Sequence, residues 1–111
     1  PPLLAVSVEI MAAMVALIAH VSIKPECVAE FFELANGMLA PSREEDACIA
    51  YNFFCKPENP STLVFVEEWA DRDGLEAHFQ TPHFQEFSKK TGALTNKVDI
   101  SIYHVDHTEK L

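Results

Sequence analysis

The chain has 111 residues, of which 49% are hydrophobic and 23% charged, the balance of one ordinary globular domain. Seventeen acidic residues against eight basic residues give a net charge of −9 at pH 7. A surface of this sign repels phosphate groups, so neither nucleic acid nor an anionic membrane is an expected partner. Three cysteines without a C-x-x-C spacing indicate reduced thiols in a cytoplasmic protein, and they exclude a zinc ribbon or a thioredoxin-type site.

The first residues differ in pattern from the rest of the chain. From residue 4 to residue 10, aliphatic residues alternate with small or polar ones, which is typical of an extended segment. Glu9 interrupts the apolar run and argues against a membrane span. We expect residues 1–10 to be an additional strand, an arm exchanged in a dimer or a remnant outside the fold. Residues 11–111 are expected to form the single domain.

Four runs rich in β-branched and aromatic residues predict β-strands. They occupy residues 14–23, 48–55, 62–69 and 97–105. Between the second and third runs, residues 56–61 contain two prolines and an asparagine and predict a hairpin loop. The first and third runs are apolar on both faces, whereas a sheet with one face in water alternates more cleanly. The second face therefore needs a cover, which a homodimer packed sheet on sheet would supply.

Two helical segments lie between these strands. The first begins at Pro25, because proline suits the first turn of a helix, and apolar residues at helical spacing extend it to Leu39. Pro41 is expected to close or kink this helix. The second segment runs from an N-cap at Asp71 to Gly92, with a break at a Thr-Pro pair. The order β-α-β-β-α-β predicts a ferredoxin-like α+β fold with a four-stranded antiparallel sheet.

Two adjacent glutamates are candidate functional residues. Glu67 and Glu68 follow each other in a predicted strand, so their side chains point to opposite faces of the sheet. If both faces are covered, at least one carboxyl group is buried, and burial raises its pKa into the range of a proton carrier. The alternative is a carboxylate at the strand end that reaches water or pairs with a base. The pattern leaves open which of the two faces the pocket.

Histidines offer a second set of candidates. His78 and His83 lack the i, i+4 spacing of a helical metal site, and no metal ion is expected. His83 falls in the first turn of a helix capped by Thr81, where the positive helix end favours a neutral imidazole. A neutral imidazole can accept a proton from a phenol, although a plain surface histidine is the alternative reading. The three scattered glycines form no phosphate-binding or dinucleotide motif, so no cofactor is expected.

The segment from Glu67 to Phe84, EEWADRDGLEAHFQTPHF, resembles the signature of the antibiotic biosynthesis monooxygenase family. That signature has a strand ending in glutamate, an aromatic residue, an acidic turn, a histidine, and T-P-H-F or T-P-H-Y. Lys24-Pro25 and the segment from Ser42 to Tyr51 resemble two further family motifs, although Asp46-Ala47 replaces the usual Pro-Gly. The resemblance extends from Met14 to Val105. It implies a dimeric α+β barrel.

The resemblance also implies a cofactor-independent monooxygenase, similar to quinol monooxygenases, that oxidises a quinol or related polyphenol with O₂. The polar positions of the motif fall on His83, Glu67 and His78 as catalytic residues, with His83 as the proton acceptor or oxyanion partner. The substrate-binding residues that the resemblance implies are Trp69, Tyr51, Asn52, Phe65 and Phe84. The expected partners are an aromatic small molecule, O₂ and a second copy of the chain.

Other readings of the family resemblance remain open. Heme-degrading relatives carry an iron-ligating histidine where this chain has Ser88, so heme is not expected. An isomerase or degrader of a phosphorylated sugar-like signal would need a basic pocket, and Arg43 and Arg72 are the only arginines. A non-catalytic dimer that binds a small molecule is the third reading, because one scaffold can host several functions.

Overall fold

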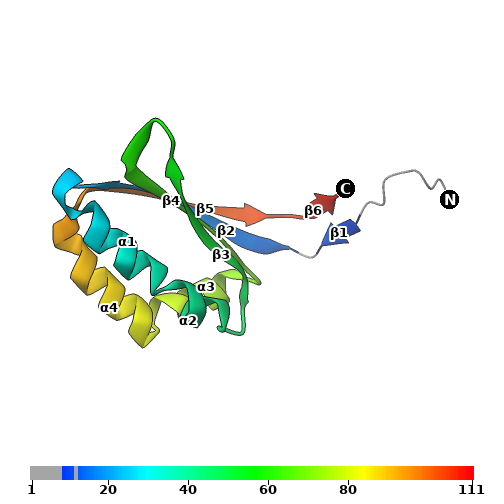
Figure 1. The fold of residues 1–111 in the computed structure, drawn as a ribbon. Helices are drawn as coiled ribbons and strands as arrows, with labels where there is room; N and C mark the ends of the chain where they lie inside the picture. Colours follow the sequence, from blue (N-terminus) through cyan, green and yellow to red (C-terminus); the bar gives the residue numbers. More distant parts are fainter. Residues whose placement is uncertain (1–8, 12) are drawn as a thin grey trace.

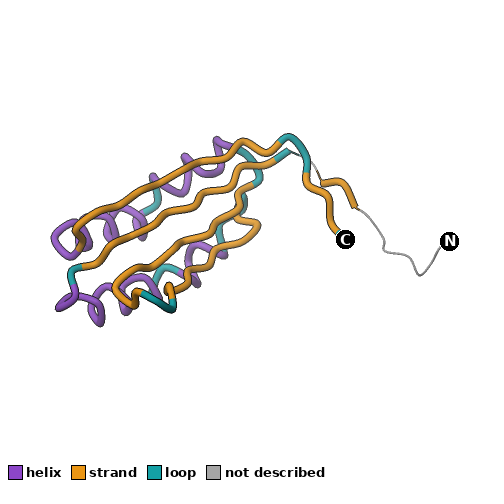
Figure 2. The backbone as a smooth tube through the Cα atoms, turned by 90° about the horizontal axis from the view of Figure 1, so that it is seen from above, coloured by secondary structure: helices purple, strands orange, loops and turns teal. Residues whose placement is uncertain are grey.

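The computed structural model describes residues 9–11 and 13–111. Four strands form one antiparallel sheet in the order β3-β4-β2-β5. Their bounds are Met14–Ile23 for β2, Cys48–Lys56 for β3, Asn59–Trp69 for β4 and Thr95–Val105 for β5. With β2 and β4 in the centre, this is the predicted ferredoxin-like order, and Figure 2 shows the four strands side by side.

The helices cover one face of this sheet and leave the other face bare (Figure 1). Four α-helices are present in the described residues: α1 (Val28–Asn36), α2 (Leu39–Arg43), α3 (Arg72–Phe79) and α4 (Pro82–Thr91). Two 3₁₀ turns flank them, η1 (Pro25–Cys27) before α1 and η2 (Gly92–Leu94) after α4. The α+β fold class inferred from the sequence is confirmed.

Two local predictions differ from the structure. The first helix ends at Asn36, one turn before Pro41, and Pro41 lies in the first turn of α2, where its missing N–H breaks no helical hydrogen bond. The hairpin loop in the structure is shorter than the predicted residues 56–61, because β4 begins at Asn59, which pairs with Lys56. A register shift after Cys55 accommodates the extra residues of β4, which allows a proline within the strand.

The core lies between the sheet and the helices. Every second residue of β2, from Val15 to Ile23, is buried against the helical layer, whereas the residues between them are half-buried or exposed. Phe31 and Ala35 of α1 and Trp69 of β4 belong to the same buried cluster. On the bare face, Phe54 of β3 and Tyr103 of β5 are more than half exposed, although both are large aromatic side chains. The bare face therefore carries apolar surface that the chain itself does not cover.

A short two-stranded ribbon projects from one end of the main sheet (Figure 2). Strand β1 (Glu9–Met11) pairs with β6 (Thr108–Lys110), which brings the two ends of the described chain together. Residues 1–8 of the expected N-terminal segment lie outside the described residues. No helix in the part of the chain that the structure describes has the length and apolar character needed to span a membrane.

Candidate functional site

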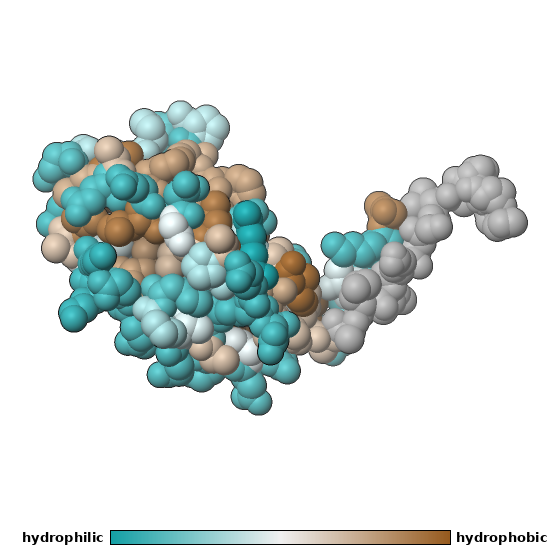
Figure 3. All heavy atoms as spheres, turned by 60° about the horizontal axis from the view of Figure 1, so that its bottom comes forward, coloured by the Kyte–Doolittle hydropathy of each residue, from teal (hydrophilic) through white to brown (hydrophobic). Residues whose placement is uncertain are grey.

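A cavity of about 230 Å³ lies between the sheet and helices α1 and α4. Its walls are mostly aliphatic and aromatic, and Val98 and Ile100 of the edge strand β5 form its more exposed side. Figure 3 looks toward the helical side of the molecule and shows apolar surface exposed among hydrophilic side chains. The aromatic lining residues are Phe31, Tyr51, Phe65, Phe79, Phe84 and Phe87. This space is suited to a small ring-shaped molecule.

Glu67 is the only acidic residue among the described residues that line the cavity. Its side chain is 5% exposed, and its Oε1 accepts a hydrogen bond of 3.0 Å from the indole Nε1 of Trp69. Burial raises the pKa of the Glu67 carboxyl from 4.5 to about 7, an increase that the Trp69 hydrogen bond opposes and the nearby negative charge of Glu45 adds to. A carboxyl group of this kind can both take and return a proton near neutral pH.

Tyr51 lies beside Glu67 on the neighbouring strand β3, since the two residues pair directly in the ladder. Burial, followed by the negative charge of Glu67, raises the pKa of the Tyr51 phenol well above its usual value. The phenol therefore stays protonated, with the buried Ser42 hydroxyl as its hydrogen-bonding neighbour, and the Tyr51 side chain lines the cavity.

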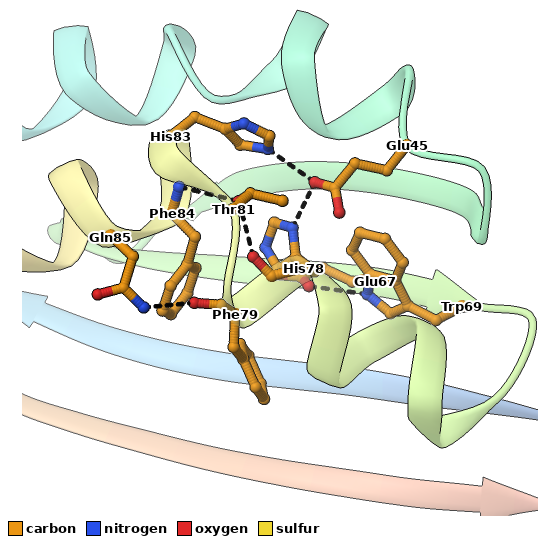
Figure 4. A network of polar contacts seen from close by, with 9 residues as sticks. All are labelled: Glu45, Glu67, Trp69, His78, Phe79, Thr81, His83, Phe84 and Gln85. Carbon is orange, nitrogen blue, oxygen red and sulfur yellow. Dashed lines mark hydrogen bonds and ion pairs between the residues drawn. The ribbon is translucent and has the colours of Figure 1, made fainter.

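Next to the aromatic lining of the cavity, the carboxylate of Glu45 contacts two histidines (Figure 4). Glu45 Oε2 lies 2.6 Å from His78 Nδ1 and 2.7 Å from His83 Nε2. His78 is 1% exposed, and burial lowers the pKa of its imidazole, so a neutral ring donates its Nδ1–H to the carboxylate. The His78 ring also lies against Trp69, with ring centroids 4.5 Å apart, and so contacts the residue that holds Glu67.

Local capping interactions explain why the two histidines converge. Thr81 is the N-cap of α4: its Oγ1 accepts from the Phe84 N–H at 3.2 Å and donates to the His78 carbonyl at 2.7 Å. Proline follows as the first helical residue, which places His83 in the first turn of α4. One Thr-Pro pair thereby ends α3 and starts α4 with both imidazoles on the side of Glu45.

Close packing of α3 positions the loop that carries Glu45. Asp71 caps α3, and its Oδ1 accepts from the Gly74 N–H at 2.7 Å. A Cβ atom on Gly74 would collide with the side chain of Ala47, so α3 can approach this loop only because residue 74 is glycine. The Ala70 N–H also donates to the Ala47 carbonyl at 2.8 Å.

The structure divides the predicted site residues into three groups. Glu67, Tyr51, Phe65 and Phe84 line the cavity. His78, His83 and Trp69 lie outside this lining: Trp69 is fully buried, and both histidines bind Glu45. Asn52 points to the bare face of the sheet, because adjacent residues of a strand alternate, and it accepts a hydrogen bond from Arg43 at 2.9 Å.

Sequence reasoning missed Glu45 as a functional residue. Glu45 binds partners 33 and 38 residues away along the chain, so no local spacing connects it with the histidines. Its position within the Ser42 to Tyr51 segment that resembles a family motif was the available signal.

The two arginines are engaged elsewhere. Arg43 Nε donates to the Tyr51 carbonyl at 3.0 Å, which holds the guanidinium at the backbone of β3. Arg72 pairs with Glu76 on the surface of α3 and lies over the Phe79 ring. Among the described residues that line the cavity, there is accordingly no arginine or lysine to bind a phosphate group.

Comparisons with known proteins found one matching family model and several similar chains. The sequence model of antibiotic biosynthesis monooxygenase matches residues 14–90. An uncharacterized protein of Synechocystis is 37% identical over 93 residues, which cover 83% of this chain and 63% of that protein. A provisionally named monooxygenase of Bacillus subtilis, YcnE, is 35% identical over 69% of this chain and 81% of that protein. The crystal structure of a conserved Methanosarcina mazei protein aligns with a TM-score of 0.78 at 32% identity, over 84% of this chain and 92% of that chain.

Proposed function

Because the chain belongs to the antibiotic biosynthesis monooxygenase family, we propose that it oxidises a quinol or related polyphenol with O₂ in the cavity beneath the sheet. The observation that carries this proposal is Glu67, a carboxyl group with a pKa of about 7 in a ring-lined apolar space. An apolar cavity of about 150 Å³ already holds benzene, so 230 Å³ admits one substituted ring.

The reaction needs a proton acceptor and a dry environment. Glu67 takes the proton of a substrate hydroxyl, and the electron-rich anion that results reduces O₂ and binds it at a ring carbon. Protonated Glu67 then returns its proton to the outer oxygen, and as the O–O bond breaks the hydrogen on the attacked ring carbon leaves as the second proton of the water. One oxygen atom becomes a ring hydroxyl of a hydroxyquinone and the other leaves as water, with all four electrons supplied by the quinol. The Tyr51 phenol is the hydrogen-bond donor for negative charge on a substrate oxygen.

Trp69, His78 and His83 act in this proposal as positioning residues. Trp69 holds Glu67 through its indole N–H, and His78 packs against the indole. Glu45 anchors His78 and His83 together from the opposite side. The proton acceptor expected at His83 is therefore reassigned to Glu67, which is the group that faces the substrate space.

A homodimer is part of the same proposal. The bare face of the sheet exposes Phe54 and Tyr103 and carries the half-buried residues Ile18 and Val66 near its centre. Packing this face against a second copy would remove that apolar surface from water. We expect Ile18→Glu to give a monomer in light scattering, whereas the surface variant Ala29→Glu remains dimeric. A dimeric Ile18→Glu variant would contradict this arrangement.

The phosphorylated-substrate alternative has no supporting observation. The described lining residues of the cavity include one acid and no base, a combination that repels a phosphate dianion.

Oxygen uptake by metal-stripped protein with a panel of quinols and polyphenols tests the proposed activity. Glu67→Gln is the informative variant, because glutamine keeps the shape of the side chain and cannot accept the proton. Glu68→Gln is the matched control, since Glu68 is the next residue of β4 and points to the other face. Incorporation of one labelled atom from ¹⁸O₂ into the product distinguishes oxygenation from simple autoxidation.

The expected result is uptake above autoxidation that falls about 10²- to 10⁴-fold in Glu67→Gln and is unchanged in Glu68→Gln. Uptake that is equal in the two variants would remove Glu67 from the mechanism. Binding of ring compounds without any uptake would favour the non-catalytic reading of the same cavity.

A further inference from the structure

We propose that Glu45, His78 and His83 form a binding site for one divalent ion of the zinc type, separate from the substrate cavity. The three candidate ligand atoms, Glu45 Oε2, His78 Nδ1 and His83 Nε2, all lie within 4.8 Å of one another. They come from three different parts of the chain: the loop before β3, the end of α3 and the first turn of α4. This inference does not rest on the proposed oxygenation.

The donor set is the one that such ions prefer. Two imidazole nitrogens and one carboxylate oxygen are common ligands of Zn²⁺ and its first-row neighbours, with a fourth position taken by water. The present contacts of 2.6 and 2.7 Å are hydrogen bonds. In a tetrahedral site the ligand atoms are about 3.3 Å apart, given metal–ligand bonds of about 2.0–2.1 Å. Binding of an ion would lengthen the two Glu45 contacts to this spacing, with the two imidazole nitrogens already within 4.8 Å of each other.

Access and charge also favour a cation at this place. His83 is 24% exposed and Glu45 is 14% exposed, so the cluster has an open side, whereas His78 is buried at its base. Glu45 stands between two exposed acidic residues, Glu44 and Asp46, in a chain with a net charge of −9. This local negative potential attracts a divalent cation toward the open side.

Aromatic side chains that line the cavity separate this site from the substrate. The centroid of the His78 ring lies 5.6 Å from that of Tyr51 and 5.2 Å from that of Phe84, and those two side chains line the cavity. A bound ion would join the loop of Glu45 to α3 and α4 and would stabilise the folded chain. Its readouts are therefore binding and stability, which can be measured without any substrate.

The test uses the full chain after EDTA treatment and dialysis. Calorimetric titration with ZnCl₂ gives the stoichiometry and the dissociation constant, and thermal unfolding with and without ZnCl₂ gives the shift in Tm. His83→Gln is the main variant, because the glutamine amide can still donate to Glu45 but is a poor zinc ligand. His107→Gln is the matched control, since His107 is 64% exposed and belongs to no part of the cluster.

We expect one Zn²⁺ per chain with a micromolar dissociation constant, and a rise in Tm of roughly 10 °C at a hundredfold excess over that constant. His83→Gln should weaken binding at least about 100-fold while its Tm without zinc stays close to that of the unchanged chain. His107→Gln should bind as the unchanged chain does. Co²⁺ should give the visible absorption of a four-coordinate site in the unchanged chain and not in His83→Gln.

Two results would overturn the proposal. Zinc binding of unchanged strength in His83→Gln would place the ion elsewhere, and a dissociation constant above about 1 mM in the unchanged chain would leave the cluster as a hydrogen-bonded cross-link only. Glu45→Gln is measured in parallel, so that a folding failure of one variant leaves the other to decide.

Discussion

Trp69 donates its indole N–H to Glu67 Oε1 at 3.0 Å, from a ring that has no exposed surface (Figure 4). An indole is a donor only, so it orients the carboxyl group without competing for its proton. The hydrogen bond favours the ionised form and opposes the larger effect of burial. Burial and the smaller effect of the Glu45 charge, opposed by this hydrogen bond, together set the pKa of Glu67 near neutrality.

Trp69→Phe should move the pH dependence of activity. In the proposed mechanism Glu67 must be ionised to accept a proton, so the rate of the unchanged chain is expected to rise with pH and to reach its plateau above a midpoint near 7. Phenylalanine keeps a ring against His78 but removes the indole donor, so the pKa of Glu67 and the midpoint of the pH–rate profile should both increase. Tyr103→Phe, on the bare face of the sheet, should leave the midpoint unchanged.

The burial of Glu67 also predicts a pH-dependent stability. Its pKa is raised from 4.5 to about 7, so between these values the folded chain holds a proton that the unfolded chain has lost. The contribution of Glu67 to the free energy of unfolding is complete below pH 4.5 and is lost as the pH rises through 7. The total loss is about 3 kcal/mol. Urea unfolding at pH 5 and pH 8 gives the free energy of unfolding of the unchanged chain and of Glu67→Gln. The titration of His78 affects both chains alike, so it cancels in the difference between them. A difference that is constant with pH would contradict the raised pKa.

Ala19→Leu should block ligand binding without unfolding the protein. Ala19 lies on β2, is 6% exposed and lines the cavity, so a larger aliphatic side chain there occupies part of the cavity. We expect ring compounds to lose at least about tenfold in affinity while Tm is unchanged or higher, because the added side chain fills empty apolar volume. Ala29→Leu on the exposed side of α1 is the control, and equal binding by both variants would place the ligand outside the cavity.

Gly74→Ala should disturb the loop of Glu45. The new methyl group would collide with Ala47, so α3 and this loop must separate, at a cost of about 1–3 kcal/mol in the free energy of unfolding. The hydrogen bonds that Glu45 accepts from the two histidines should weaken with that movement, which the imidazole proton resonances report in NMR spectra. Gly92→Ala is the matched control, since nothing lies within 4 Å of a Cβ atom at that position.

The two N-caps can be predicted from the sequence because the hydrogen bonds that form them lie within a few residues of the cap. Asp71 and Thr81 were predicted as N-caps, and each accepts a hydrogen bond from the backbone N–H three residues later. The break after Asn36 was not predicted, since apolar residues at helical spacing continue across it. Gly37 directly follows Asn36 as the C-cap of α1 and was the available local signal.

The candidate site was only partly predictable for a related reason. Tyr51 and Asn52 were both expected in the pocket, but neighbours in a strand face opposite ways, so alternation alone excludes one of them. The meeting of Glu45 with His83 depends on the tertiary packing of the loop against α4. Sequence patterns identify the residue types of such a cluster but not which of them meet.

The single hydroxyl of Thr81 has a mechanical consequence for the cavity. It donates to the His78 carbonyl in the last turn of α3 and accepts from the Phe84 N–H in the first turn of α4. The Gln85 amide donates to the Phe79 carbonyl at 2.7 Å across the same corner. Phe79 and Phe84 flank this corner with ring centroids 5.1 Å apart, and both rings line the cavity. The angle between α3 and α4 therefore affects the width of the cavity: opening this corner would make room for a wider molecule while every strand stays in place.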